Sequence, residues 1–152
     1  MTPIDPRSRG EILNQLARFA RVVDAKDWDA VSDVFADDVV FDYGDLGEER
    51  GIVALRDQFR RYLDNCGATQ HLIGSIILNR DGDHLVSRAY VQARHQGAGG
   101  RADRFLDTNG EYVDRWEEQP DGWRIVRRDA VWAIHMGDFS VLMPEDAAAT
   151  HN

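Results

Sequence analysis

Apolar residues near the start of the chain recur at helical spacing. The stripe at i, i+4, i+7 and i+11 comprises Ile12, Leu16, Phe19 and Val23. Ser8 and Glu11 have the spacing of a capping box, so we predict that this helix begins near Ser8. Two further helices are expected at residues 28–35, after the N-cap candidate Asp27, and at residues 52–63.

After residue 69 the apolar residues alternate with polar ones, which indicates strands. Residues 81–83, with a central glycine, are typical of a hairpin turn, and residues 119–122 are typical of a second turn. A shorter strand is expected earlier, at residues 39–43. The long predicted strands are residues 69–79, 84–96, 108–118 and 123–136.

Helices that precede an antiparallel meander define an α+β domain. We predict three N-terminal helices packed on one face of a curved antiparallel sheet, with a conical cavity between the two layers. Residues 1–152 form a single domain, ordered over about 8–143, with tails at 1–7 and 144–152. The apolar segment after Met136 is a candidate cover for the cavity mouth.

The composition of the 152 residues is that of an ordinary globular protein, with 43% hydrophobic and 30% charged residues. The formal net charge of -9 argues against a nucleic-acid surface, because phosphates would be repelled. No stretch approaches the roughly 18 apolar residues of a membrane span, and the first residues lack the apolar run of a signal peptide. We therefore expect a cytoplasmic protein without nucleic-acid or membrane partners. One cysteine, Cys66, allows no internal disulfide.

A histidine near the start of the first long strand is the centre of the functional prediction. His71 is expected on the cavity face together with Ile73, Ser75 and Ile77. Asp24 falls on the apolar side of the first helix, where an isolated carboxylate is costly and needs a partner. We predict that Asp24 orients His71 as a general base. The alternative is that Asp24 only ends the helix and faces solvent.

The expected hairpin register brings a second histidine close to the first. If the apolar faces of the two strands coincide, His71 lies opposite Ala93 and diagonal to His95. Diagonal neighbours are about 7–8 Å apart at the backbone, so both imidazoles can contact one small molecule. His135 is a third histidine, but the close histidine spacing typical of zinc or iron sites is missing, and we predict no metal. Tyr43, at the end of the short strand, is a candidate wall residue.

Charged residues elsewhere are expected at the surface. We predict that Arg127, Arg128 and Asp129 form surface or interface ion pairs. The exposed face of the second long strand carries Tyr90 and Arg94 and suggests a self-association surface.

Several segments together resemble scytalone dehydratase and, more broadly, the SnoaL-like superfamily. They are residues 23–29, 41–43, 69–74 and 94–96. The similarity runs from about Asp24 to Trp132, and the order of Asp24, Tyr43, His71 and His95 makes it specific. It implies the cone-shaped α+β barrel shared with ketosteroid isomerase and nuclear transport factor 2, and assembly as a homodimer or homotrimer. Bile-acid dehydratases and a hexachlorocyclohexane dehydrochlorinase of the superfamily use an Asp–His pair, which corresponds to Asp24 and His71.

The resemblance also implies a role for each of these side chains. His71 abstracts a proton α to a carbonyl, and Asp24 fixes its tautomer and stabilises the imidazolium. Tyr43 donates a hydrogen bond to the carbonyl oxygen as enolate charge develops. His95 helps to expel the leaving hydroxyl as water. The elimination uses only proton transfers and oxyanion stabilisation, so no metal or organic cofactor is expected.

The chain departs from scytalone dehydratase at three positions of the expected site. Val23 stands where that enzyme has a second tyrosine, Tyr112 where it has an asparagine, and Gly110 where it has a serine. These departures argue against scytalone itself as the substrate but leave the Asp–His pair unchanged.

The leading function is therefore a cofactor-independent lyase, a dehydratase acting on a cyclic or polyketide-like hydroxy ketone. An isomerase or cyclase that uses the same base is the first alternative, and a non-catalytic binding or oligomerisation module is the second. The expected partner is a hydrophobic or cyclic small molecule. The side chains expected to bind it are Tyr112, Trp28, Trp132 and Phe139.

Overall fold

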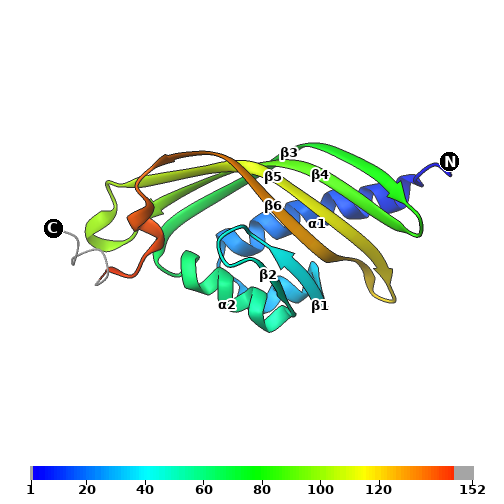
Figure 1. Cartoon of the computed structure of the whole chain (residues 1–152), viewed down its shortest axis with the longest axis horizontal. Coiled ribbons are helices and arrows are strands. Elements are labelled where there is room, and N and C mark those ends of the chain that lie inside the picture. The colour runs from blue at the N-terminus through cyan, green and yellow to red at the C-terminus, as the bar shows by residue number, and fades with distance from the viewer. Residues whose placement is uncertain (1, 146–152) are drawn as a thin grey trace.

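The computed structural model describes residues 2–145, which form a long curved sheet with helices along its inner side (Figure 1). In chain order the elements are α1 (Pro6–Asp24), the 3₁₀ helix η1 (Trp28–Asp33), β1 (Phe35–Asp42), β2 (Glu48–Arg50), α2 (Ile52–Leu63), β3 (Cys66–Asp81), β4 (His84–Gly97), the 3₁₀ helix η2 (Gly99–Arg101), β5 (Phe105–Gln119), β6 (Gly122–Gly137) and the 3₁₀ helix η3 (Phe139–Leu142). The predicted α+β class is confirmed.

The six strands form one open sheet in the order β2-β1-β6-β5-β4-β3. Strands β3 to β6 pair as the predicted antiparallel meander. Strand β1, however, runs parallel to β6, so the sheet is mixed. The prediction of a sheet that is antiparallel throughout is wrong in this respect. The alternation of residues 35–42 indicates a strand, but it carries no information about the direction of the neighbouring strand.

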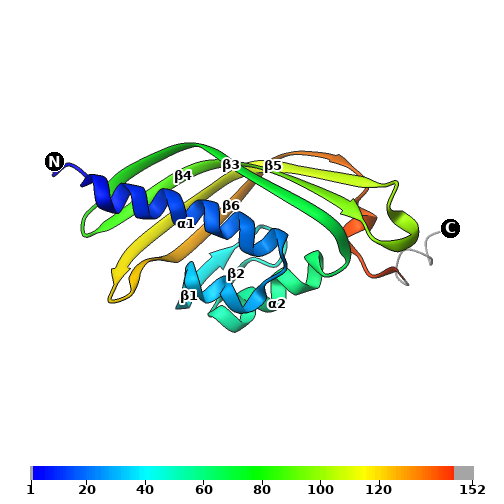
Figure 2. The ribbon, with the colours of Figure 1, turned by 180° about the vertical axis from the view of Figure 1, so that it is seen from behind.

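Helix α1 lies across the inner side of the sheet (Figure 2). The predicted apolar stripe faces the sheet, and its four residues are buried: Ile12, Leu16, Phe19 and Val23. Burial of each such side chain contributes about 1.5–3 kcal/mol relative to exposure, so this stripe fixes α1 on the sheet. The last residue of α1, Asp24, is thereby brought to the edge strand β3.

The predicted hairpin register is confirmed at the site. His71 pairs with Ala93, and Thr69 pairs with His95, in the antiparallel ladder of β3 and β4. The ring centroids of His71 and His95 are 5.7 Å apart.

Beyond the site, a β-bulge changes which residues of β3 point to the inner face of the sheet. The register shifts between Gly74 and Ile77, and Ser75 adopts a left-handed backbone conformation with φ of 48°. The expectation that Ser75 and Ile77 share the face of His71 is therefore wrong. Ile77 is 59% exposed, whereas Leu78 is buried in the core.

The first helix begins earlier than predicted. Asp5 is the N-cap, and its side chain accepts a hydrogen bond of 2.9 Å from the backbone N–H of Ser8. Pro6 occupies the first helical turn, where it needs no N–H partner. The predicted tail at residues 1–7 is thus partly helical, while the predicted tail at 144–152 lies outside the described residues after Glu145.

The second predicted helix is shorter and of a different kind. Residues 28–33 form a 3₁₀ helix, and Phe35 already belongs to β1. Phe35 is buried against the core, and its apolar neighbours fit both a helical and an extended pattern.

The C-terminal segment is fastened to the end of the sheet by a buried arginine. The guanidinium of Arg101 donates hydrogen bonds to the backbone oxygens of Ser140, Met143 and Asn65. Asn65 also donates to the backbone oxygen of Leu142 at 2.9 Å. These contacts hold η3 beside the end of α2. Among residues 2–145, no helix is long and apolar enough to cross a bilayer.

Candidate active site

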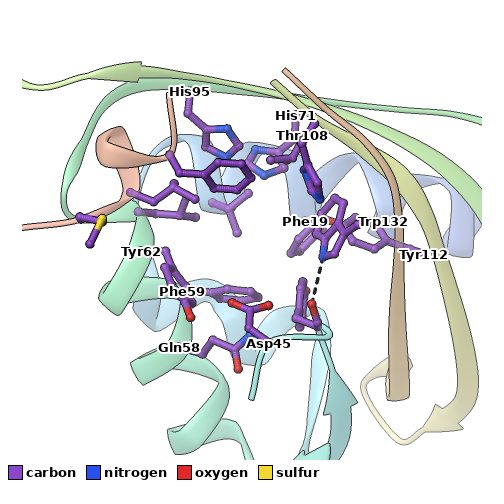
Figure 3. Close-up of a pocket in the computed structure, with 17 residues that line it drawn as sticks. Phe19, Asp45, Gln58, Phe59, Tyr62, His71, His95, Thr108, Tyr112 and Trp132 are labelled. Carbon is purple, nitrogen blue, oxygen red and sulfur yellow. Dashed lines mark hydrogen bonds between the residues drawn. The ribbon is translucent and has the colours of Figure 1, made fainter. Parts of the chain in front are cut away.

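A cavity of about 350 Å³ opens between the sheet, α1, α2 and η3. Its wall is mostly apolar and aromatic, with polar groups at a few positions (Figure 3). The predicted site residues Tyr43, His71 and His95 all line it. This combination of an apolar cavity and a few convergent polar groups is typical of a small-molecule site.

His71, which lines this cavity, forms a hydrogen-bonded pair with Asp24, which does not line it. Oδ1 of Asp24 lies 2.7 Å from Nδ1 of His71. The carboxylate also accepts hydrogen bonds from the backbone N–H of His71, at 3.0 Å, and from the hydroxyl of Thr69, at 2.9 Å. Three donors therefore hold one carboxylate in place, and Asp24 does not merely end the helix facing solvent.

The fold explains why a helix end can hold this histidine. Strand β3 is an edge strand, so alternate N–H groups point away from β4 and need another acceptor. Asp24 supplies that acceptor for the N–H of His71 and reaches the side chain of the same residue. Backbone and imidazole are thus fixed by one group.

The pair has a defined protonation pattern. Burial opposes the charge of Asp24, but the hydrogen bonds from His71 and Thr69 outweigh it and lower the pKa of the carboxyl. An ionised carboxylate only accepts, so Nδ1 of His71 carries the proton that it donates. Since His71 lines the cavity and Nδ1 is held by Asp24, Nε2 is the nitrogen available to a ligand.

His95 is fixed by a different contact. Its Nδ1 lies 3.0 Å from the backbone oxygen of Leu106, an acceptor, so Nδ1 carries a proton. Burial is the main cause that lowers the pKa of His95, and the nearby His71 adds to it, while the bond to Leu106 opposes it. His95 is therefore neutral near pH 7 and presents a free Nε2.

A buried ion pair lies behind the cavity wall. Arg128 and Asp114 are both 0% exposed and make two hydrogen bonds of 2.7 Å. The guanidinium carbon of Arg128 lies 4.1 Å from the ring centroid of Phe19 and 4.0 Å from that of Tyr112. The prediction that Arg128 forms a surface ion pair is wrong. Arg127 lies in the exposed position and pairs with Glu48 and Asp129.

Sequence reasoning missed the connection between this pair and Tyr43. Arg128 donates to the hydroxyl oxygen of Tyr43 at 3.5 Å, which leaves the phenolic proton for another acceptor. Burial is the main cause that raises the pKa of Tyr43, so the phenol keeps its proton. No signal in the sequence indicated this, because simple alternation from the buried Ile125 places Arg127 inward, and a register shift in β6 between Ile125 and Arg127 brings Arg128 to the buried face instead.

Three of the four expected ligand-binding aromatic residues line the cavity: Tyr112, Trp132 and Phe139. Trp28 does not line it, which corrects the prediction. Its indole packs against Phe59 in the core, with ring centroids 6.2 Å apart, and its Nε1 donates to Asp64 at 3.0 Å. The hydroxyl of Thr108, which was not predicted, lies at the histidine end of the cavity (Figure 3).

The part of the chain that the structure describes contains no group of three His, Cys, Asp or Glu side chains arranged to hold a metal ion. His135 lies near Trp132 and Phe139, with ring centroids 6.2 Å and 5.4 Å away, and not beside the other two histidines.

The architecture is the cone-shaped α+β fold of the nuclear transport factor 2-like superfamily. The profile of the SnoaL-like domain matches residues 6–129. The chain belongs to the SnoaL-like family, as the sequence resemblance predicted.

Relatives of known sequence and structure agree with this placement. The uncharacterized protein Rv2910c from Mycobacterium tuberculosis is 31% identical over 121 residues, which cover 79% of this chain and 82% of that protein. The structure of a candidate aromatic ring hydroxylase from Novosphingobium aromaticivorans has a TM-score of 0.81 at 26% identity and covers 92% of this chain and 99% of that one.

Two further structures carry names of elimination enzymes. A candidate scytalone dehydratase from Novosphingobium aromaticivorans has a TM-score of 0.77 at 16% identity, covering 86% of this chain and 87% of that chain. The hexachlorocyclohexane dehydrochlorinase LinA-type3 from Novosphingobium barchaimii has a TM-score of 0.75 at 13% identity, covering 87% and 90%. At these identities the likeness concerns the fold alone.

Proposed function

We propose that this protein is a cofactor-independent lyase that removes water from a cyclic or polyketide-like hydroxy ketone. The observation that carries the proposal is the 2.7 Å contact of Asp24 with His71, which lines a largely apolar cavity. The names of the dehydratase and the dehydrochlorinase that share the fold support an elimination reaction.

His71 is the base in this proposal. Its Nε2 takes the proton from the carbon next to the substrate carbonyl, and the electrons of that C–H bond form an enolate. Asp24 stabilises the imidazolium that results, because its carboxylate already holds the Nδ1–H. The enolate then expels the hydroxyl from the next carbon, and the hydroxyl leaves as water with the proton from His71.

His95 and Tyr43 assist at the two oxygens of the substrate. Neutral His95 accepts a hydrogen bond at Nε2 from the departing hydroxyl and orients it toward His71. Tyr43 donates its phenolic proton to the enolate oxygen. The charge of Arg128 lies behind this phenol and strengthens it as a donor, so we assign Arg128 a positioning role.

Substitution of the pair is the direct test. Asp24→Asn and His71→Ala should each lower turnover by about 10²–10⁴-fold while the protein stays folded, because each removes an interaction formed in the transition state. The assay follows loss of water by mass across cyclic β-hydroxy ketones. Circular dichroism confirms folding, and Asp38→Asn, an exposed acid on β1, is the matched control.

The outcomes separate the candidate functions. Water loss that depends on His71 supports the lyase. A product of unchanged mass that still depends on His71 would instead indicate an isomerase or cyclase. Near-wild-type turnover in either variant would contradict the role of the pair.

A further inference from the structure

The cavity has polar groups at two separate ends (Figure 3). His71 and His95 lie at one end, where the proposed chemistry takes place. Asp45, Gln58 and Tyr62 lie at the opposite end, near α2 and the loop that follows β1. Apolar and aromatic side chains separate the two groups. A ligand that fills the cavity therefore meets polar groups at both of its ends.

Asp45 is the acidic side chain in the cavity wall. None of the described residues that line it is a lysine or an arginine, and Asp45 is the one carboxylate among them. Asp45 forms no ion pair with any of residues 2–145. No lysine or arginine of the wall can therefore pair with an anionic group at this end, whereas Asp45 can accept a hydrogen bond from a hydroxyl.

Gln58 gives a second, independent indication of a ligand group at this end. Its side chain lines the cavity although the residue is only 6% exposed, and within residues 2–145 it has no side-chain hydrogen-bond partner. Among the described residues, its amide atoms are not counted with the polar atoms that are both closed off from solvent and without a partner, so they are accessible to a ligand group. Tyr62 adds a donor, since burial first and Asp45 second raise the pKa of its phenol.

We infer that Asp45, together with Gln58, binds a hydroxyl group of the substrate at the end of the molecule remote from His71. The ligand is then a small molecule that carries a neutral hydroxyl group at this end and fits a cavity of about 350 Å³. Asp45 is exposed, and its charge disfavours a carboxylate or phosphate group at this end of the ligand. This inference rests on the proposed function in one respect: the lyase proposal decides that the end of the substrate beside His71 is the end that reacts.

A series of three ketones of equal shape tests this inference. The probes are 1-tetralones that carry a hydroxymethyl, a methyl or a carboxylate group at ring position 6. Dissociation constants are measured from the change in tryptophan fluorescence, since Trp132 lines the cavity. A hydrogen bond to a charged acceptor should make the alcohol bind about tenfold more tightly than the methyl compound, and the carboxylate should bind most weakly.

Asp45→Asn should move two affinities in opposite directions. The advantage of the alcohol should shrink severalfold, and the carboxylate should bind more tightly than it does to the wild type. Loss of the fold would weaken all three probes, so it cannot produce this pattern. Asp38→Asn, which removes an exposed charge outside the cavity, is the matched control and should leave all three affinities unchanged.

Three results would overturn the inference. They are unchanged affinities in Asp45→Asn, a wild type that binds the carboxylate as tightly as the alcohol, and a wild type that binds none of the three ketones. The binding series is repeated in His71→Ala, so that it does not depend on turnover. If no hydroxy ketone loses water, the lyase proposal fails while these affinities still stand. If Asp45 proves irrelevant, turnover that depends on Asp24 is untouched.

Discussion

At the scale of single residues, the site places charge where a helix does not favour it. Asp24 is the last residue of α1, at the negative end of the helix dipole, where a carboxylate is unfavourable by about 0.3–1 kcal/mol. Hydrogen bonds from Thr69 and from two groups of His71 offset this cost. Asp24 thus lowers the stability of the end of α1 but holds the imidazole of His71 in one orientation.

His95 should make the stability of the fold depend on pH. Its folded pKa lies below its ordinary value of 6.5, mainly through burial, so the unfolded chain binds the proton first as pH falls. The free energy of unfolding contributed by this group is fully present above about pH 6.5 and declines as pH falls toward the folded pKa. His95→Asn keeps a donor near the oxygen of Leu106 but does not titrate.

Urea unfolding of the wild type and of His95→Asn, measured at about pH 7.5 and about pH 5, checks this expectation. The loss of stability between the two pH values should be smaller in the variant. An equal loss in both proteins would show that folding does not lower the pKa of His95.

At the scale of elements, the ladder of β5 and β6 contains a buried ion pair. Asp114 and Arg128 are cross-strand partners and supply each other's counter-charge in the absence of solvent. The guanidinium also packs against Phe19 of α1, so the pair joins the helix to the sheet beneath the cavity. Loss of one partner leaves an uncompensated charge in this layer.

Asp114→Asn should therefore lower the free energy of unfolding by about 3–5 kcal/mol. Denaturant unfolding measures the change. The double variant Asp114→Leu/Arg128→Met should be less destabilised than Asp114→Leu alone, because no isolated charge remains. Additive losses in the double variant would show that the two groups do not act as a pair.

Sequence patterns were informative where one period dominated. The stripe of α1, the helix at residues 52–63 and the register of β3 with β4 follow from apolar spacing and a glycine turn, and so does the approach of His71 to His95. Long-range features were not readable. The parallel pairing of β1, the burial of Arg128 and the position of Trp28 depend on which elements meet in space.

At the scale of the whole molecule, one face of the sheet is covered by helices and the other is open. Large apolar side chains on the open face are exposed: Leu72, Tyr90, Val131, Ile134 and Met136. Ion pairs of Arg88 with Glu111 and of Arg94 with Asp107 lie among them. An exposed apolar area with a polar surround is typical of an association surface, and we propose that copies of this chain meet there.

Tyr90→Lys should shift the protein from a dimer or trimer toward the monomer, because a buried lysine at the contact would lack a partner. Light scattering coupled to size-exclusion chromatography measures the mass. Val53→Lys, at an exposed apolar residue of α2 away from this face, is the control and should keep the wild-type mass. A wild type that is monomeric at every concentration would contradict the proposal.

The bulge in β3 separates two parts of one strand that can change independently. On one side of Ser75 the strand presents the histidine to the cavity, and on the other side Leu78 seals the core near the hairpin. If the strand kept its length and alternated without the bulge, Leu78, which lies seven residues after His71, would face solvent, while His71 would keep its pairing with Ala93. Residues of β3 before the bulge therefore determine the site, and residues after it determine the packing of the core. Substitutions that change the chemistry can occur in the first part without disturbing the core contact of Leu78.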